Sequence, residues 1–263
     1  MNQMLPPGPL IRRHAASLVL LALGIALIAT QLGPPLDIAW MRLWFDAGER
    51  RFIGQSCPAI VGLYRAVPWL GWILLALAIV VVTLPSTRRR PHWRRAAASA
   101  LGIAVIANGV IVEAGFKDQW GRPRPTSVQP FGGPHAYTPV WQPAAACARN
   151  CSLASGHAAA GFWLMAWGAL AQRRRWHRLM IAGIVLGLSI GVGRTMQGAH
   201  FPSDVLAAGC IVLACSLIWR RLWIRARWWR RHSLMAAQGR QEAGGTLSDG
   251  GLPPSPASTD WAS

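Results

Sequence analysis

Two histidines, His157 and His200, each lie directly before an apolar segment and beside residue types that bind anions. Ser155 offers a hydroxyl, and Gly156 lets a ligand approach the backbone closely. If a helix begins here, its free N–H groups and its dipole favour negative charge at this point. The segment predicts an oxyanion site beside His157, although a helix cap followed by a chance histidine also explains it when it is taken alone.

The second histidine has a carboxylate and a cation near it in the chain. Asp204 follows His200 by four residues, close enough to reach back to the ring. A carboxylate on one imidazole nitrogen fixes the tautomer and leaves the other nitrogen free to act as a nucleophile. Arg194, shortly before His200, adds positive charge. This segment predicts a nucleophilic histidine near a bound phosphate.

A third segment supplies further positive charge. Lys117 is the only lysine in the chain, and Arg124 follows it in an Arg-Pro-Arg-Pro run. Lysine gives a compact charge and arginine a planar fork that matches phosphate oxygens, so the pair is expected to neutralise a phosphoryl group. A basic cluster flanking a membrane is the plain alternative. Glu113, one turn before Lys117, is expected to pair with Lys117 or Arg124.

The elements that must position these residues are apolar blocks. The chain has 263 residues, of which 52% are hydrophobic, and its mean hydropathy is +0.28. A helix needs about 20 apolar residues to cross a bilayer. Six blocks qualify, the fourth and fifth being short enough to extend into their flanks or to be partly buried in protein. They are residues 15–32, 67–84, 96–116, 158–171, 179–192 and 205–223. We therefore expect an all-α polytopic membrane protein with six transmembrane helices, the first being retained rather than cleaved as a signal peptide.

The formal net charge of +18 is concentrated in particular connections. Both ends and the connections after the second and fourth blocks hold 18 of the 27 Lys and Arg residues. Cationic excess stays on the cytoplasmic side, so both termini are expected there, and nucleic-acid binding is not expected. Residues 33–66, 117–157 and 193–204 then lie on the outer side, which places the site at the outer membrane face.

The positions of the cysteines and the composition of the chain lead to further predictions about disulfides, metal sites and domain boundaries. Cys57, Cys147 and Cys151 fall on the predicted outer side, where an oxidising compartment permits a disulfide, but the sequence does not choose the pair. No metal site is predicted, because zinc spacing is absent. We expect a cytoplasmic N-terminus over 1–14, a membrane domain over 15–231 and a disordered tail over 232–263.

Together the three segments resemble the signature of the type 2 phosphatidic acid phosphatase superfamily, which includes the vanadium-dependent haloperoxidases. Its parts are Lys-x6-Arg-Pro, Pro-Ser-Gly-His and Ser-Arg-x5-His-x3-Asp. Every spacing matches this chain, with Ala154 in place of Pro and Gly193 in place of Ser. The motifs lie within residues 96–223. The lost serine is expected to remove one phosphate hydrogen bond.

The resemblance implies a two-step phosphoryl transfer. His200 would attack phosphorus and form a phosphohistidine, with Asp204 orienting it. His157, charged, would protonate the leaving oxygen and then activate water, which gives a bell-shaped pH profile. The residues implied to bind the phosphoryl oxygens are Lys117, Arg124, Ser155, Gly156 and Arg194. No metal or other cofactor is implied.

The resemblance also implies a substrate that lies in the bilayer. It points to a lipid phosphate or pyrophosphate in a bacterial inner membrane, of the lipid A or undecaprenyl pyrophosphate type and reached from the periplasm. Residues 120–125 and 148–152 look similar to bacterial members that include lipid A phosphatases. A lipid phosphotransferase would use the same residues. An inactive lipid-binding or transport protein is the alternative of another class, and the sequence predicts no oligomeric state.

Overall fold

The computed structural model describes residues 15–29 and 33–248, and the chain divides into two compact units, residues 1–220 and 221–263. The helices are α2 (Ala15–Ala29), α3 (Gly33–Arg42), α4 (Pro58–Thr83), α5 (Pro91–Ile103), the π-helix η3 (Ala104–Lys117), α6 (Gly156–Phe162), α7 (Leu164–Trp167), α8 (Arg173–Met196) and α9 (Pro202–Ser248). Short 3-10 turns are η1 (Ile53–Gln55), η2 (Pro85–Arg89), η4 (Pro125–Ser127) and η5 (Gln129–Phe131). A small antiparallel hairpin pairs β1 (Phe45–Asp46) with β2 (Arg51–Phe52).

Local sequence signals explain where several helices begin. Pro58, Pro91 and Pro202 occupy the first position of α4, α5 and α9, where a missing N–H costs nothing and the fixed φ suits a helix. Ser155 caps α6, its side chain accepting a hydrogen bond from the N–H of Ala158 at 3.4 Å. These signals place the start of α6 and the start of α9 beside the two histidines.

Four helices among the described residues are long and apolar enough to cross a membrane. They cover Pro58–Thr83, Pro91–Lys117, Arg174–Met196 and Pro202–Arg230. These correspond to the second, third, fifth and sixth predicted blocks. The apolar stretch of α2, Ser17–Ala26, is shorter.

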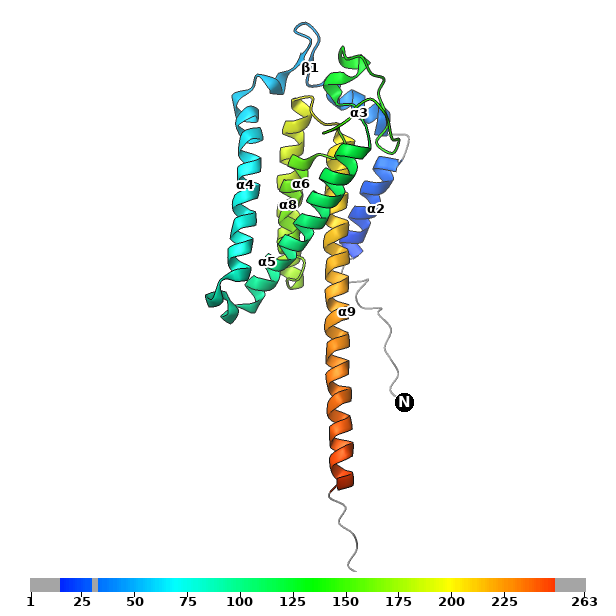
Figure 1. The fold of residues 1–263 in the computed structure, drawn as a ribbon. Helices are drawn as coiled ribbons and strands as arrows, with labels where there is room; N and C mark the ends of the chain where they lie inside the picture. Colours follow the sequence, from blue (N-terminus) through cyan, green and yellow to red (C-terminus); the bar gives the residue numbers. More distant parts are fainter. Residues whose placement is uncertain (1–14, 30–32, 249–263) are drawn as a thin grey trace, which may run out of the picture. The chain divides into compact units, whose positions relative to one another are not determined.

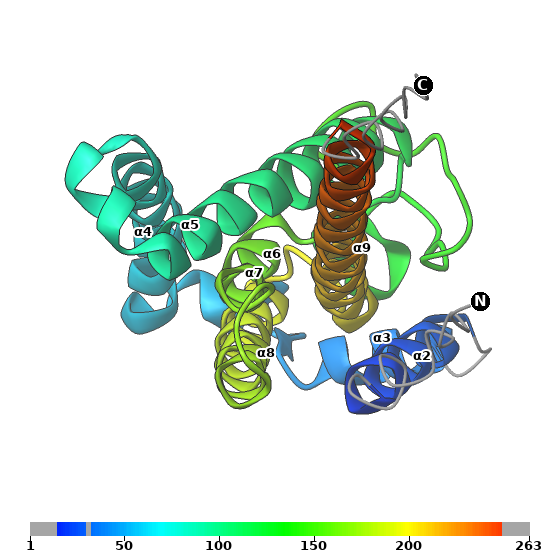
Figure 2. The same cartoon turned by 90° about the horizontal axis from the view of Figure 1, so that it is seen from below.

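The fourth predicted block is not one continuous helix. It forms the short helices α6 and α7, which pack against α8 (Figure 2). Small residues permit this close packing, since a Cβ on Gly161 would lie 2.8 Å from the Cα of Gly187. Phe162, Met165 and Ala166 are buried in the core that these helices share. The block is therefore covered by protein, and it does not need the length of a span that lies against lipid.

The connections that carry the predicted chemistry gather at one end of the first unit. Figure 1 shows α3, the hairpin, the long loop after η3 and the first turn of α9 at the same end. The third block, an ordinary helix by prediction, continues from α5 as a π-helix and ends at Lys117. π-helical turns are rare and often occur at functional sites.

The second unit corrects the predicted tail. Residues 221–248 are helical as the continuation of α9, whereas a disordered tail was expected from 232. The segment up to Ala243 is rich in Arg and Ala, which favour helices, whereas Gly, Ser and Pro are concentrated further on. The predictions for 1–14 and 249–263 lie outside the described residues.

A buried ion network ties three outer segments together. The guanidinium of Arg122, with no exposed surface, donates to Asp37 Oδ2 at 2.9 Å, to Ser203 Oγ at 3.0 Å and to a carboxylate oxygen of Asp204. Asp37 lies in α3, and Ser203 and Asp204 lie in the first turn of α9. Burial opposes the charge, but Asp204 and Asp37 outweigh it and raise the pKa of Arg122.

Replacing Arg122 with methionine is expected to destabilise the fold by about 3–5 kcal/mol, because it leaves two buried carboxylates without a cation. The matched control is Arg51→Met, since Arg51 pairs with Glu49 at the surface, where such pairs contribute about 1 kcal/mol or less. The measurement is the unfolding midpoint of the detergent-solubilised protein, followed by tryptophan fluorescence. If the unfolding midpoints of the two variants shifted equally, the buried network would contribute no more to stability than the surface pair, contrary to this expectation.

Candidate active site

The three predicted segments meet in the structure. Cys151 N–H donates to the Lys117 carbonyl at 2.9 Å, which joins the His157 segment to the Lys117 segment. Ser155 N–H donates to the Asp204 carbonyl at 3.3 Å, which joins the His157 segment to the His200 segment. The Arg122–Asp204 ion pair joins the Lys117 segment to the His200 segment. Segments that lie far apart in sequence are therefore held by direct contacts around one site.

His200 is buried and held by a backbone carbonyl. Its Nδ1 lies 2.7 Å from the Ser152 carbonyl oxygen, and its side chain is 2% exposed. A carbonyl can only accept, so Nδ1 carries the proton and Nε2 keeps a free lone pair. This is the tautomer that a nucleophilic histidine needs.

Asp204 acts on His200 less directly than the sequence predicts. Its Oδ2 lies 4.0 Å from His200 Nδ1, too far for a hydrogen bond. The same oxygen accepts from Ser152 Oγ at 2.6 Å and from Phe201 N–H at 2.8 Å. Asp204 therefore fixes Ser152, whose carbonyl holds the ring of His200. It also fixes the backbone at Phe201, directly after His200.

The predicted cations surround both histidines. Burial, followed by the positive charges of Arg194 and Arg124, holds the pKa of His200 well below its ordinary value. Burial, followed by Arg194 and Lys117, lowers the pKa of His157 to about 4. Because both rings respond to the same cations, the charges lie around a common centre, as an anion site requires.

Two cavities open on this centre. One, of about 380 Å³, has a polar lining that includes Arg124, Arg194 and Tyr64. The other, of about 430 Å³, is lined mainly by apolar residues of α4, η3 and α6 and also contacts Lys117 and His157. The site thus lies between a polar cavity and an apolar one.

Lys117 and Gly156 meet at the edge of the apolar cavity. Lys117 Nζ pairs with Glu113 Oε1 at 2.7 Å, which confirms the expected contact between these residues. A Cβ on Gly156 would lie 2.8 Å from Lys117 Nζ and would also meet the Glu113 carboxylate. Glycine is therefore required for the ion pair to approach the start of α6.

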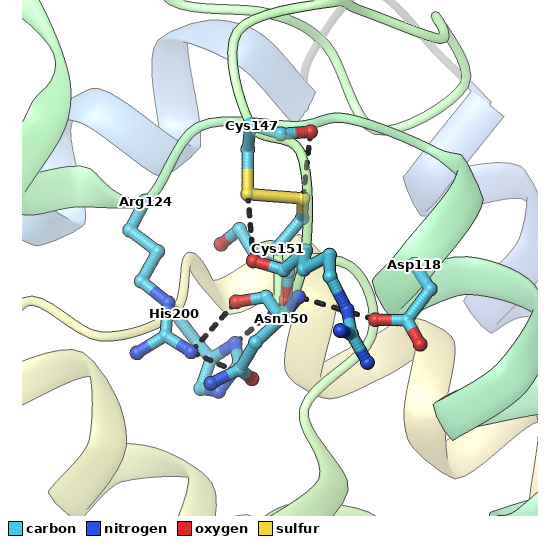
Figure 3. The surroundings of a disulfide bond; sticks show 8 residues. Asp118, Arg124, Cys147, Asn150, Cys151 and His200 are labelled. Carbon is cyan, nitrogen blue, oxygen red and sulfur yellow. Dashed lines mark hydrogen bonds between the residues drawn. A yellow bond between two sulfur atoms is a disulfide. The ribbon is translucent and has the colours of Figure 1, made fainter.

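Arg124 is held by a disulfide-closed loop. Cys147 and Cys151 form a disulfide, the pair that the sequence left open, and Cys57 is free. Asn150, with a left-handed φ of 53°, accepts from Arg124 Nη2 through its carbonyl at 2.9 Å and its Oδ1 at 3.0 Å. Figure 3 shows Arg124 and Asn150 beside His200, close to the disulfide.

Sequence reasoning missed three residues that organise the site: Asp37, Arg122 and Tyr64. Asp37 is one of nine acidic residues, and this scarcity was a usable signal. Arg122 lies in the same Arg-Pro-Arg-Pro run as Arg124, and nothing local separates the buried arginine from the half-buried one. Tyr64 stacks on the ring of His157, with ring centroids 4.8 Å apart.

Comparison with known proteins identifies the family. The PAP2 superfamily model matches residues 96–229. A lipid A 4'-phosphatase of Francisella tularensis subsp. novicida is 32% identical over 183 residues, covering 68% of this chain and 82% of that protein. A lipid A 4'-phosphatase of Rhizobium etli is 26% identical over 218 residues, covering 75% and 85% respectively. No solved structure matches the chain significantly.

The chain belongs to the PAP2 superfamily. The resemblance that the three segments indicated is thereby confirmed, and with these relatives it makes the chain a phosphatase. The match covers both histidines, Asp204 and the predicted cations, whereas Asp37 and Tyr64 lie before it.

The protonation of His157 in this PAP2 protein differs from the sequence expectation. With a pKa of about 4, the free protein carries a neutral His157 at neutral pH, not the charged ring that was expected. Burial of the ring is the main physical reason, and the cations around the site add to it because they repel a further positive charge. A phosphate monoester retains a proton up to a pH of about 6, so we expect the substrate to bring the proton for the leaving oxygen.

We expect kcat/KM not to fall between pH 7 and pH 5, because the lowered pKa of His200 keeps its Nε2 unprotonated there. Above a pH of about 6, kcat/KM is expected to fall as the substrate loses its proton. The measurement is phosphate release at low substrate concentration across this range. An acidic limb with a midpoint at about 6.5, the ordinary histidine value, would contradict the lowered pKa.

Removing the disulfide in this PAP2 protein should weaken phosphate binding. The double variant Cys147→Ser, Cys151→Ser frees Asn150 and thereby the guanidinium of Arg124. Loss of about 1 kcal/mol of hydrogen bonding corresponds to a KM raised roughly 5-fold. Cys57→Ser is the control and should keep the original KM. If a reductant and the double variant both leave KM unchanged, the loop does not position Arg124.

Proposed function

We propose that this PAP2 protein hydrolyses a phosphate ester of lipid A through a phosphohistidine on His200. The observation that carries the proposal is the free Nε2 of a buried neutral His200, whose Nδ1 is held 2.7 Å from the Ser152 carbonyl oxygen amid three cations. Phosphoryl transfer depends mainly on positioning and on charge stabilisation, and both are present here.

The reaction proceeds in two steps with His157 exchanging one proton. The lone pair of His200 Nε2 forms a bond to phosphorus, and the bond from phosphorus to the lipid oxygen breaks. The bound phosphate monoester first gives its proton to Nε2 of His157, which is neutral in the free protein, and the lipid oxygen takes that proton from His157 as it leaves. A water molecule then gives a proton to His157 and attacks phosphorus, and the bond to Nε2 of His200 breaks. Inorganic phosphate leaves with the proton of His157, which returns the ring to its neutral state.

The phosphoryl oxygens are bound by built-in groups in this proposal. Lys117, Arg124 and Arg194 supply positive charge, so the reaction needs no metal or other cofactor. The Gly156 amide, at the first turn of α6, adds a hydrogen-bond donor. Ser155 Oγ already accepts from the Ala158 N–H, and its hydroxyl proton stays free to donate to the phosphate.

Lipid A is the substrate that the observations favour over undecaprenyl pyrophosphate. Both relatives named above are lipid A 4'-phosphatases. The two cavities also suit an amphiphile, with the phosphorylated sugar in the polar cavity and an acyl chain beside the apolar lining. The partner of this protein is therefore a lipid in the bilayer.

We further propose a bacterial inner-membrane protein with six transmembrane segments, both termini in the cytoplasm and the site facing the periplasm. The four long apolar helices, the short apolar α2 and the α6–α7 pair supply the six segments. The arginine-rich connections lie away from the site, as the positive-inside rule requires. The disulfide between Cys147 and Cys151 suits an oxidising compartment.

Purified protein is expected to release inorganic phosphate from lipid A in mixed micelles with no acceptor lipid present. His200→Ala should lower this rate by about 10³-fold or more, because the nucleophile is lost. The matched control is His92→Ala, which removes an exposed histidine of α5.

Three outcomes would contradict the proposal. Phosphate transfer only after an acceptor lipid is added would identify a phosphotransferase. Equal rates for His200→Ala and the unchanged protein would rule out the phosphohistidine step. No release by the unchanged protein, with lipid A still bound, would indicate an inactive lipid-binding or transport protein.

A further inference from the structure

Tyr64 of α4 contacts two residues of the proposed site, although it lies outside the three motifs. Its ring stacks on the ring of His157, with centroids 4.8 Å apart and planes at 24°. The guanidinium carbon of Arg194 lies 4.4 Å from the centroid of the same ring. One side chain of α4 therefore lies against both a histidine at the start of α6 and an arginine at the end of α8.

The backbone of Tyr64 makes a second contact because of a proline. Pro68 lies inside α4, four residues after Tyr64, and has no N–H to donate to the Tyr64 carbonyl. The Tyr64 backbone lies near enough to the ring of His157 to raise the pKa of that ring against the effect of burial. Only an acceptor favours the protonated ring, so the group involved is the carbonyl that Pro68 leaves free.

The remaining nitrogen of His157 is unoccupied. Its Nε2 is buried and has no hydrogen-bond partner in the described part of the chain. The ring nitrogen that remains for the Tyr64 carbonyl is Nδ1. This arrangement leaves Nε2 available to the leaving oxygen of a bound phosphate ester and then to a water molecule.

We propose that Tyr64, through the carbonyl that Pro68 frees and through its ring, is a positioning residue that fixes His157 and Arg194 relative to each other. The inference rests on the proposed function, in which His157 exchanges the proton and Arg194 binds the phosphoryl group. Tyr64 lines the polar cavity but touches none of the reacting atoms, and it acts on the reaction through the orientation of its two neighbours.

A structural role for Tyr64 alone would have different consequences. The ring is 40% exposed, as a tyrosine at a membrane boundary often is, and such a residue contributes mainly to stability. Pro68→Ala separates the two explanations. It restores an N–H that bonds the Tyr64 carbonyl within the helix, so it should stabilise α4 while it removes the acceptor from His157.

The first experiment measures kcat and the thermal midpoint of the full-length protein with lipid A. Tyr64→Leu is expected to lower kcat by about 10- to 100-fold, within the range that proton transfer contributes. Tyr64→Phe, which keeps the ring and the carbonyl, should recover most of that loss. Pro68→Ala should lower kcat while its thermal midpoint is unchanged or raised. Trp69→Leu, an exposed aromatic residue of the same helix, is the control and should match the unchanged protein.

The second experiment does not depend on turnover. Nitrogen NMR of histidine-labelled protein reports the ring tautomer, and His157→Gln assigns the signal. We expect the proton on Nδ1 in the unchanged protein and a mixture of tautomers in Pro68→Ala. If the protein releases no phosphate from lipid A, the proposed function fails, and the tautomer still decides this inference.

Three results would overturn the inference. One is a kcat for Tyr64→Leu and Pro68→Ala equal to that of the unchanged protein. Another is a His157 tautomer that Pro68→Ala does not alter. A fall in kcat for Trp69→Leu as large as that for Tyr64→Leu would also overturn it, because any disturbance of α4 would then suffice.

Discussion

The guanidinium of Arg122 is buried between two carboxylates, and the site depends on this contact. An isolated charge at such a position is very unfavourable, so Arg122 stays buried only when Asp37 and Asp204 are both in place. Asp37 comes from α3 and Asp204 from the first turn of α9. The charge balance therefore requires that segments distant in the sequence assemble together, and His200 lies only four residues before Asp204.

Assembly around Arg122 produces a centre that is prepared for an anion. Asp204 holds Ser152, Ser152 holds His200, and the disulfide-closed loop holds Arg124. Burial and positive charge keep both histidines neutral in the free protein. In the proposed reaction, the negative charge of a bound phosphate offsets the charge of the cations. A protonated His157 is then less unfavourable, and it can give its proton to the leaving oxygen. The same electrostatics govern binding and proton transfer.

The sequence predicted what depends on residue type and spacing. Charged residues are scarce in apolar blocks, so the four long helices and the clustering of Lys117, His157 and His200 could be inferred. The contacts of Asp204 could not be, because a spacing of four residues permits a bond to the ring without requiring it. The break between α6 and α7 and the role of Tyr64 depend on packing between distant helices. The choice of Cys147 and Cys151 over Cys57 depends on a loop conformation that no local pattern specifies.

The central claim is that His200 Nε2 becomes covalently bonded to phosphorus. Rapid acid-free quenching of the protein with lipid A labelled in its phosphate, followed by peptide mass spectrometry, tests this claim most directly. We expect an acid-labile, alkali-stable phosphoryl group on His200, accumulating in His157→Gln because that variant hydrolyses the intermediate slowly. A phosphoryl group on another residue, or none under conditions of rapid turnover, would contradict the account.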